Sequence, residues 1–113
     1  MLENTWTQHI VNTVPHFKGY ETEVRLWDRT RPDLVGPTEI LEVDWSAKWK
    51  EGVGQACFYG MQTGLNPGLL LLFTDGINSE KERLRGYRAK LACIPAGISL
   101  YLYDCRDEKL ILA

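Results

Sequence analysis

The sequence predicts an α/β domain in which helices flank a mixed central sheet. Three observations predict it. Segments in the N-terminal half alternate polar and apolar residues, which is the period of a half-buried strand. The apolar run Leu69–Phe73 is typical of a strand covered on both faces, and segments with helical periodicity lie on either side of it. Because a chain of 113 residues supports one core, we expect a single domain over residues 1–113.

The N-terminal half is predicted to contain a helix and three strands. Trp6, Ile10 and Val14 recur at helical spacing in residues 3–14, and Pro15 ends that pattern. Strands are expected at 21–27, 31–35 and 39–45, because each is extended in pattern and is separated from the next by a short polar or Gly-Pro connector. We expect these three strands to form an antiparallel meander.

The C-terminal half is predicted to alternate helices and strands. A helix follows Ser46, which can act as its N-cap, and it runs from Ala47 to about Thr63, where Gly64 ends it. An apolar strand at 68–74, an amphipathic helix from 78 to about 91 and a strand at 98–103 come next, and 110–112 adds a short strand. The expected order is therefore α-β-β-β-α-β-α-β.

Composition excludes several classes of protein. The chain has 13 basic and 15 acidic residues, so it lacks the positive field of a strongly basic nucleic-acid binder. Its three cysteines form no Cys-x-x-Cys pair, which argues against a disulfide framework or a structural zinc site. The N-terminus lacks a signal-peptide pattern, and the longest apolar run is too short to span a membrane. We expect a cytoplasmic protein without membrane association.

Acidic residues on the third predicted strand indicate a metal site. Glu42 and Asp44 are two residues apart and therefore point to the same face of a strand built otherwise of apolar residues. Two neighbouring carboxylates there repel each other, and a divalent cation would remove that cost. Asp33, on the preceding strand, can reach the same ion. Oxygen ligands of this kind suit Mg²⁺, so we assign the metal to Asp33, Glu42 and Asp44.

The helix that follows supplies groups for phosphate chemistry. Lys48 lies in its first turn and should point back toward the carboxylates, and Gln55 returns to nearly the same face seven residues later. The free N–H groups of the helix N-terminus favour an anion at that place. A metal, a lysine and an amide together suit phosphodiester hydrolysis. The alternative from the residues alone is an α/β interaction protein whose acids are solvated surface.

Asp33 after Pro32, the acidic strand around Glu42 and the spacing Gln55-x-x-x-Tyr59 resemble the PD-(D/E)XK nuclease superfamily. The Gln-to-Tyr segment is similar to a motif of RecB-type nuclease domains, and residues 42–55 resemble small bacterial and phage nuclease-like proteins. The resemblance, which includes Holliday-junction resolvases, implies a restriction-endonuclease-like α-β-β-β-α-β core. It also implies a Mg²⁺- or Mn²⁺-dependent DNA endonuclease, a hydrolase that leaves a 5′-phosphate, with Asp33 and Glu42 as the metal-binding acids.

The sequence departs from that superfamily at one position. Its members usually have a lysine two residues after the second acid, where this chain has Asp44. Either Lys48 has taken over the lysine's role, with Lys50 as a less well-placed substitute, or the domain is a degenerate module that binds DNA or dimerises without cutting. The superfamily's additional glutamate is assigned to Glu21, with Glu23 as an alternative of the same strand parity.

Two partners are expected for this domain, DNA and a second copy of the chain. Exposed basic residues near the acids are expected to contact DNA phosphates, and they are Arg25, Arg31 and Lys50. A catalytic core this small leaves little surface for recognising a long target. We therefore expect a two-fold homodimer, which would suit a branched substrate such as a DNA junction.

Overall fold

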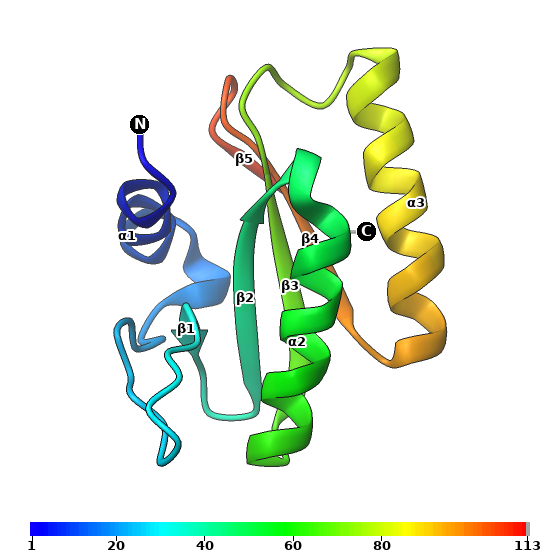
Figure 1. The fold of residues 1–113 in the computed structure, drawn as a ribbon. Coiled ribbons are helices and arrows are strands. Elements are labelled where there is room, and N and C mark those ends of the chain that lie inside the picture. The colour runs from blue at the N-terminus through cyan, green and yellow to red at the C-terminus, as the bar shows by residue number, and fades with distance from the viewer. Residues whose placement is uncertain (113) are drawn as a thin grey trace.

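The computed structural model describes residues 1–112, and the backbone alone at Leu112. Its centre is a five-stranded sheet in the order β1-β2-β3-β4-β5 (Figure 1). Strands β2, β3 and β4 are parallel, and β1 and β5 are antiparallel to their neighbours. The strands are β1 Leu34–Val35, β2 Glu39–Trp45, β3 Asn66–Phe73, β4 Ser99–Asp104 and β5 Lys109–Leu112.

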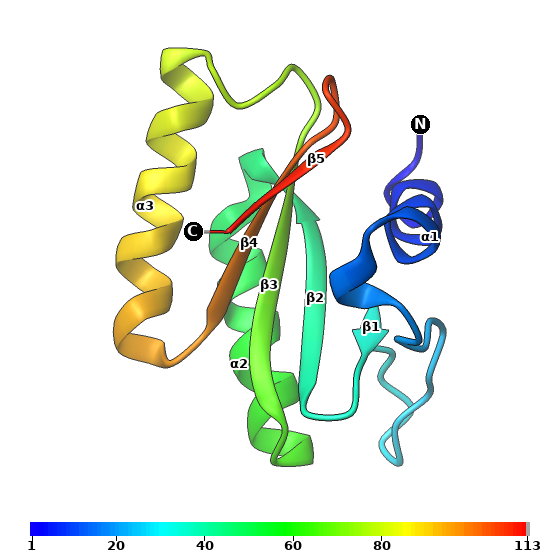
Figure 2. The same cartoon turned by 180° about the vertical axis from the view of Figure 1, so that it is seen from behind.

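Helices cover both faces of this sheet, which confirms the predicted α/β class. On one face lies α1, Glu3–Thr13, followed by the 3-10 turn η1, Pro15–Phe17 (Figure 2). On the other lie α2, Trp49–Thr63, and α3, Glu80–Ala96. Strand β3 is central, and its successive leucines enter the two apolar clusters alternately, as its apolar run predicts. Within residues 1–112 no helix is both long and apolar enough to cross a membrane.

A close approach places α2 directly over the end of β2. A Cβ atom at Gly52 would lie 2.7 Å from Leu69 Cδ1 and 3.5 Å from the Cβ of Asp44. A side chain at this position would force the buried Leu69 to shift, so the first turn of α2 lies directly against the sheet. The carboxyl end of β2 is thereby covered by this helix.

The predicted strand at 21–27 is wrong, and the strand at 31–35 is shorter than expected. From this region only Glu21 pairs with the sheet edge, in an isolated bridge to Val35, and β1 has two residues. Glu23 and Arg29 have φ angles of 57° and 73°, which break an extended path. The Asp33 carboxylate also accepts the N–H of Val43, a β2 group that a longer β1 would have bonded. The expected meander is therefore reduced to one short antiparallel pair.

The helix boundaries also differ from the prediction. Ser46 does not cap α2, because it lies in a 3-10 turn, η2 Ser46–Lys48, and its hydroxyl donates to Glu82 of α3 at 2.8 Å. Helix α3 begins after Ser79, its N-cap, and continues beyond Leu91 to end at Gly97, which has φ 68°. The short last strand is confirmed as β5.

Candidate active site

Asp33 closes an open edge of the sheet beside β2. Strand β1 pairs with β2 only at Ile40 and Leu41, so the later residues of β2 have no described strand on that side. Asp33 Oδ2 accepts a hydrogen bond from the Val43 N–H at 2.8 Å. This bond fixes the Asp33 carboxylate next to the side chain of Glu42.

Glu42 and Asp44 lie on the face of β2 that α2 covers, as their spacing predicts. Their neighbours across the sheet are leucines of β3, so no polar group of that strand's side chains solvates them. Burial raises the pKa of Glu42, and the hydrogen bond with the Asp33 carboxyl and that group's charge raise it further. Burial also raises the pKa of Asp44, although the Trp45 N–H donates to Asp44 Oδ1 at 3.0 Å and opposes the rise.

A fourth carboxyl group comes from Glu3, the first residue of α1. Burial, together with the charges of Asp33 and Asp44, raises the pKa of Glu3 to about 7. The Glu3 and Asp44 side chains also share a hydrogen bond. We call Glu3, Asp33, Glu42 and Asp44 the carboxylate cluster.

The structure brings Glu3 to this cluster, rather than Glu21 as the sequence suggested. Glu21 is exposed, and its backbone pairs with Val35 at the sheet edge. Glu23, the alternative, is exposed and lines a depression of about 190 Å³ that Asp33 also lines. An acid in the first turn of a helix is common, so the sequence offers no signal that distinguishes Glu3.

Lys48 and Gln55 lie at different distances from the cluster. Lys48 is exposed at the end of η2, and its charge lowers the pKa of both Glu3 and Asp44. Gln55 lies about 10 Å further along α2, where it lines a separate exposed groove. Lys50 extends over the Trp49 ring at 5.6 Å, pointing into a depression of about 470 Å³ that Lys48 also lines.

Tyr59 ties the cluster to α2. Its buried hydroxyl donates to the carbonyl of Arg31 at 3.1 Å, which holds the chain just before Asp33. Burial raises the pKa of Tyr59, and the charges of Glu42 and Asp33 raise it further, so this ring lies beside the same carboxyl groups. The tyrosine that the motif singled out therefore positions the segment that carries Asp33.

Hydrogen-bond donors satisfy the other buried acids that the structure describes. Tyrosine hydroxyls donate to Glu39, a serine and an arginine donate to Glu82, and backbone N–H groups donate to Asp104. Such bonds offset the cost of burying a carboxylate. The carboxylate cluster differs: backbone N–H groups donate to Asp33 and Asp44, but Glu42 and Glu3 lie against these two carboxyl groups, which raise their pKa values.

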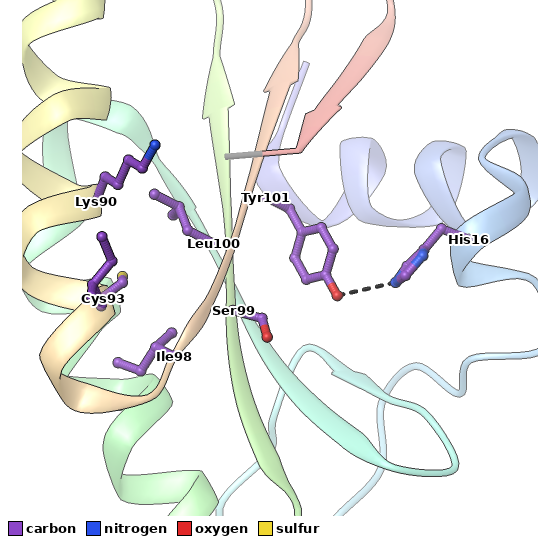
Figure 3. A pocket seen from close by; sticks show the side chains of 8 residues that line it. His16, Lys90, Cys93, Ile98, Ser99, Leu100 and Tyr101 are labelled. Carbon is purple, nitrogen blue, oxygen red and sulfur yellow. Dashed lines mark hydrogen bonds between the residues drawn. The ribbon is translucent and has the colours of Figure 1, made fainter.

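Glu39 illustrates the contrast at the opposite end of β2. The Tyr101 hydroxyl donates to both carboxylate oxygens at 2.9 Å, and the Tyr20 hydroxyl donates at 2.7 Å. Figure 3 shows Tyr101 extending from β4 toward His16, whose ring nitrogen lies 3.1 Å from the same hydroxyl. This carboxyl group joins η1 to the sheet, so its burial has a structural explanation.

The cluster can hold a cation only after a rearrangement. Within residues 1–112, no group of three or more His, Cys, Asp or Glu side chains has the spacing of a preformed metal site. The donors are nevertheless carboxylate oxygens, which are the ligands that Mg²⁺ and Mn²⁺ prefer. A cation would have to displace the protons of the two carboxyl pairs and draw their oxygens together.

Comparisons with protein-family models, curated proteins and solved structures find no match to this chain. The residues of the site are therefore the basis for assigning its chemistry. Besides the cluster and Lys48, the exposed guanidinium groups of Arg25 and Arg31 lie on the segment that leads into Asp33. The carboxylate cluster, the Lys48 ammonium and the segment that carries these two guanidinium groups therefore all lie at this edge of the sheet.

Proposed function

We propose that this protein is a divalent-metal-dependent DNA endonuclease that hydrolyses phosphodiester bonds. The observation that supports it is that four carboxyl groups from three separate segments meet at one sheet edge and pair with each other. The other buried acids that the structure describes are bonded to hydroxyl, guanidinium or backbone donors, whereas Glu3 and Glu42 have other carboxyl groups as partners. Clustered carboxylates with raised pKa values destabilise the metal-free protein near neutral pH, and a bound cation would reverse that effect.

The carboxylate cluster and Lys48 would have different roles in hydrolysis. Asp33, Glu42 and Asp44 would hold Mg²⁺ or Mn²⁺, and Glu3 would add a fourth oxygen ligand. The bound ion would lower the pKa of a water molecule and polarise the phosphate. Lys48, which faces the cluster, would offset the charge that develops on the phosphate oxygens.

The other predicted residues would act on the nucleic acid further away. Gln55 lies too far along α2 to share a ligand with Glu42, and we assign it to orienting a phosphate in the groove that it lines. Arg25, Arg31 and Lys50 are exposed and would contact DNA phosphates.

The test is cleavage of labelled linear duplex, single-stranded and four-way-junction DNA with Mg²⁺, Mn²⁺ or EDTA. We expect metal-dependent cleavage that Asp33→Asn and Glu42→Gln both abolish. Glu21→Gln is the matched control, because it neutralises an exposed acid outside the cluster, and it should cut like the wild type. Cleavage that survives Asp33→Asn, or that EDTA does not stop, would overturn the proposal.

Lys48 has a separate test within the same assay. Lys48→Ala should lower the cleavage rate strongly, whereas Lys50→Ala should weaken DNA binding and leave the rate at saturating DNA nearly unchanged. If Lys48→Ala cuts at the wild-type rate, the lysine role belongs to Lys50 or to no residue, and the Lys50→Ala rate decides between these.

The second candidate function is a degenerate nuclease-fold module that binds DNA without cutting it. It is favoured by Asp44, an acid at the position where the superfamily has a lysine, and by the protons that the carboxyl pairs retain. This module would bind DNA in a gel-shift assay and show no cleavage with either metal. Cleavage by the wild type alone, and not by Glu42→Gln, excludes it.

The homodimer remains part of the proposal, and the outer face of α3 supports it. Four large apolar side chains are exposed there at positions i, i+3, i+7 and i+10, which form one stripe along the helix: Leu84, Tyr87, Leu91 and Ile94. We place the two-fold contact on this stripe. Sedimentation should give the mass of two chains, and Leu91→Glu should give one. Basic residues flank the stripe, so salt should strengthen the dimer.

We also propose a cytoplasmic location. Cys57, Cys93 and Cys105 are free thiols, and the last two are buried. Burial raises the pKa of Cys93 to about 11, which keeps it as an unreactive thiol in the core. A reducing compartment suits such a chain. Localisation of a tagged protein in its own cells tests this directly, and export from the cell would contradict it.

A further inference from the structure

The segment before Asp33 forms an ordered hairpin, which we call the arm and define as residues 22–32. Its tip is a tight turn in which the Leu26 N–H donates to the Thr30 carbonyl and the Arg29 N–H donates to the Leu26 carbonyl, both at 2.9 Å. The Thr30 hydroxyl donates to Asp28 at 2.6 Å and lies 3.4 Å from the Gln62 side-chain oxygen of α2. The arm is therefore held in place, and it projects beyond β1 at the sheet edge (Figures 1 and 2).

The tip of the arm presents an aromatic ring between cationic side chains. Trp27 is 84% exposed, so its indole contributes little to the core. Arg25, Arg29 and Arg31 are exposed at every second position around it. Asp28 is the one acid in residues 24–31, and Thr30 donates to it from both its N–H and its hydroxyl. The outward surface of the tip is thus aromatic and positively charged.

At the tip of the arm, Arg29 has a backbone conformation that is strained for a residue with a side chain. Arg29 has φ 73°, the left-handed region, at the hairpin position that glycine ordinarily fills. Glycine would relieve the backbone and lose the guanidinium. Arg29→Gly therefore removes the positive charge and keeps the backbone conformation of the arm, so an effect on binding can be distinguished from an effect on folding.

Two depressions border the arm. One, of about 190 Å³, is lined by Arg31 of the arm and by Asp33 of the cluster. The other is a groove of about 580 Å³ between Thr30 of the arm and Glu51, Gln55 and Phe58 of α2. Phe58 is half-exposed there, which adds a second aromatic ring. Trp27 is six positions before Asp33, so the Cα atoms of the two residues lie within roughly 20 Å of each other. At about 3.4 Å per nucleotide, a base on Trp27 would lie within about six nucleotides of the cluster.

We propose that the arm binds single-stranded DNA beside the scissile phosphate. Trp27 stacks on an unpaired base, Arg25, Arg29 and Arg31 bind the flanking phosphates, and the strand continues past Arg31 toward Asp33, along the depression that these two residues line. An aromatic ring interleaved with arginines recognises a free base face, which a continuous duplex does not offer. The inference rests on the proposed nuclease function and names its substrate class: DNA with an unpaired stretch next to the cut.

The test is binding of labelled oligothymidylate and of the matching oligo(dA)·oligo(dT) duplex, by fluorescence anisotropy with Ca²⁺ in place of Mg²⁺. A gel run afterwards checks that the DNA is intact. We expect tighter binding of the single strand, a loss of about 5- to 150-fold for Trp27→Ala and a much smaller loss for Trp27→Phe, which keeps a ring. Arg29→Gly should weaken binding and reduce the slope of log affinity against log salt by about 0.7, while its thermal unfolding shows a fold at least as stable.

The outcomes separate this inference from the proposed function. If the duplex binds as tightly as the single strand, or if Trp27→Ala binds like the wild type, the arm does not do what we propose, whatever the cleavage assay shows. If the single strand binds through Trp27 and no DNA is cut with Mg²⁺ or Mn²⁺, the arm inference holds and the nuclease proposal fails. Cleavage more than about six nucleotides from the unpaired stretch of a gapped substrate would also overturn the placement of the strand.

Discussion

Replacing Glu3 by Gln should stabilise the metal-free protein at pH 8 and leave its stability near pH 4.5 unchanged. Glutamine keeps the shape of the side chain and removes its charge. The pKa of Glu3 rises from 4.5 to about 7 on folding, so the folded chain holds this proton more tightly than the unfolded chain does. Stability from this group is therefore full below pH 4.5 and is lost as the pH rises to about 7.

The size of the effect follows from that shift. A rise from 4.5 to about 7 corresponds to about 3.4 kcal/mol, and because Glu3 is half-exposed, solvent screening reduces this to about 1–2 kcal/mol. In a domain of this size we expect the melting temperature of Glu3→Gln to exceed that of the wild type by roughly 4–8 °C at pH 8. Thermal unfolding followed by circular dichroism in EDTA, at pH 4.5 and pH 8, measures it.

Glu21→Gln serves as the control, since it neutralises an exposed acid and should change the stability by less than about 0.5 kcal/mol at either pH. Mg²⁺ should stabilise the wild type at pH 8 and stabilise Glu3→Gln less, because one oxygen ligand is gone. The reasoning fails if Glu3→Gln is no more stable than the wild type at pH 8, or if it has the same advantage at pH 4.5.

Two further predictions concern the packing that positions the site. Gly52→Ala should destabilise the protein by about 1–3 kcal/mol, because its Cβ would lie 2.7 Å from Leu69 Cδ1, whereas Gly54→Ala on the same helix meets nothing within 4 Å and should be neutral or slightly stabilising; denaturant unfolding compares the two. Ser46→Ala should cost about 1–3 kcal/mol by the same measurement, because the buried Glu82 loses a donor at 2.8 Å, and Ser46→Thr should recover most of it.

The elements that the sequence predicts well are those whose pattern is satisfied within the sheet. The apolar run Leu69–Phe73 became the central strand because both of its faces need cover. The strand that the alternation predicts at residues 21–27 does not form, because a half-buried strand also needs a free edge of a neighbouring strand to pair with. At the edge of β2, the side chain of Asp33 takes the N–H of Val43 that the next strand would have used. Local periodicity carries no information about such competition.

The same limit applies to the candidate site. Glu42 and Asp44 share a face because strand geometry has a period of two, and Lys48 faces them because it follows them directly. Glu3 reaches Asp44 only because α1 crosses the edge of the sheet, which is a tertiary fact without a local signature. Sequence proximity to Asp33 therefore favours Glu21, which the fold leaves exposed.

What distinguishes the cluster from the other acids of the chain is the identity of its partners. A folded protein that keeps a carboxylate for structural reasons supplies it with donors, as Tyr101 does for Glu39. In the cluster, backbone N–H groups donate to Asp33 and Asp44, but Glu42 and Glu3 lie against those carboxyl groups and have raised pKa values, so their cost to stability rises with pH. In the proposed function a bound cation offsets this cost, as the tyrosine hydroxyls do for the single carboxyl group of Glu39. The proposed role of Trp27 follows the same reasoning, because a ring that is 84% exposed contributes little to the core and is free to stack on a base.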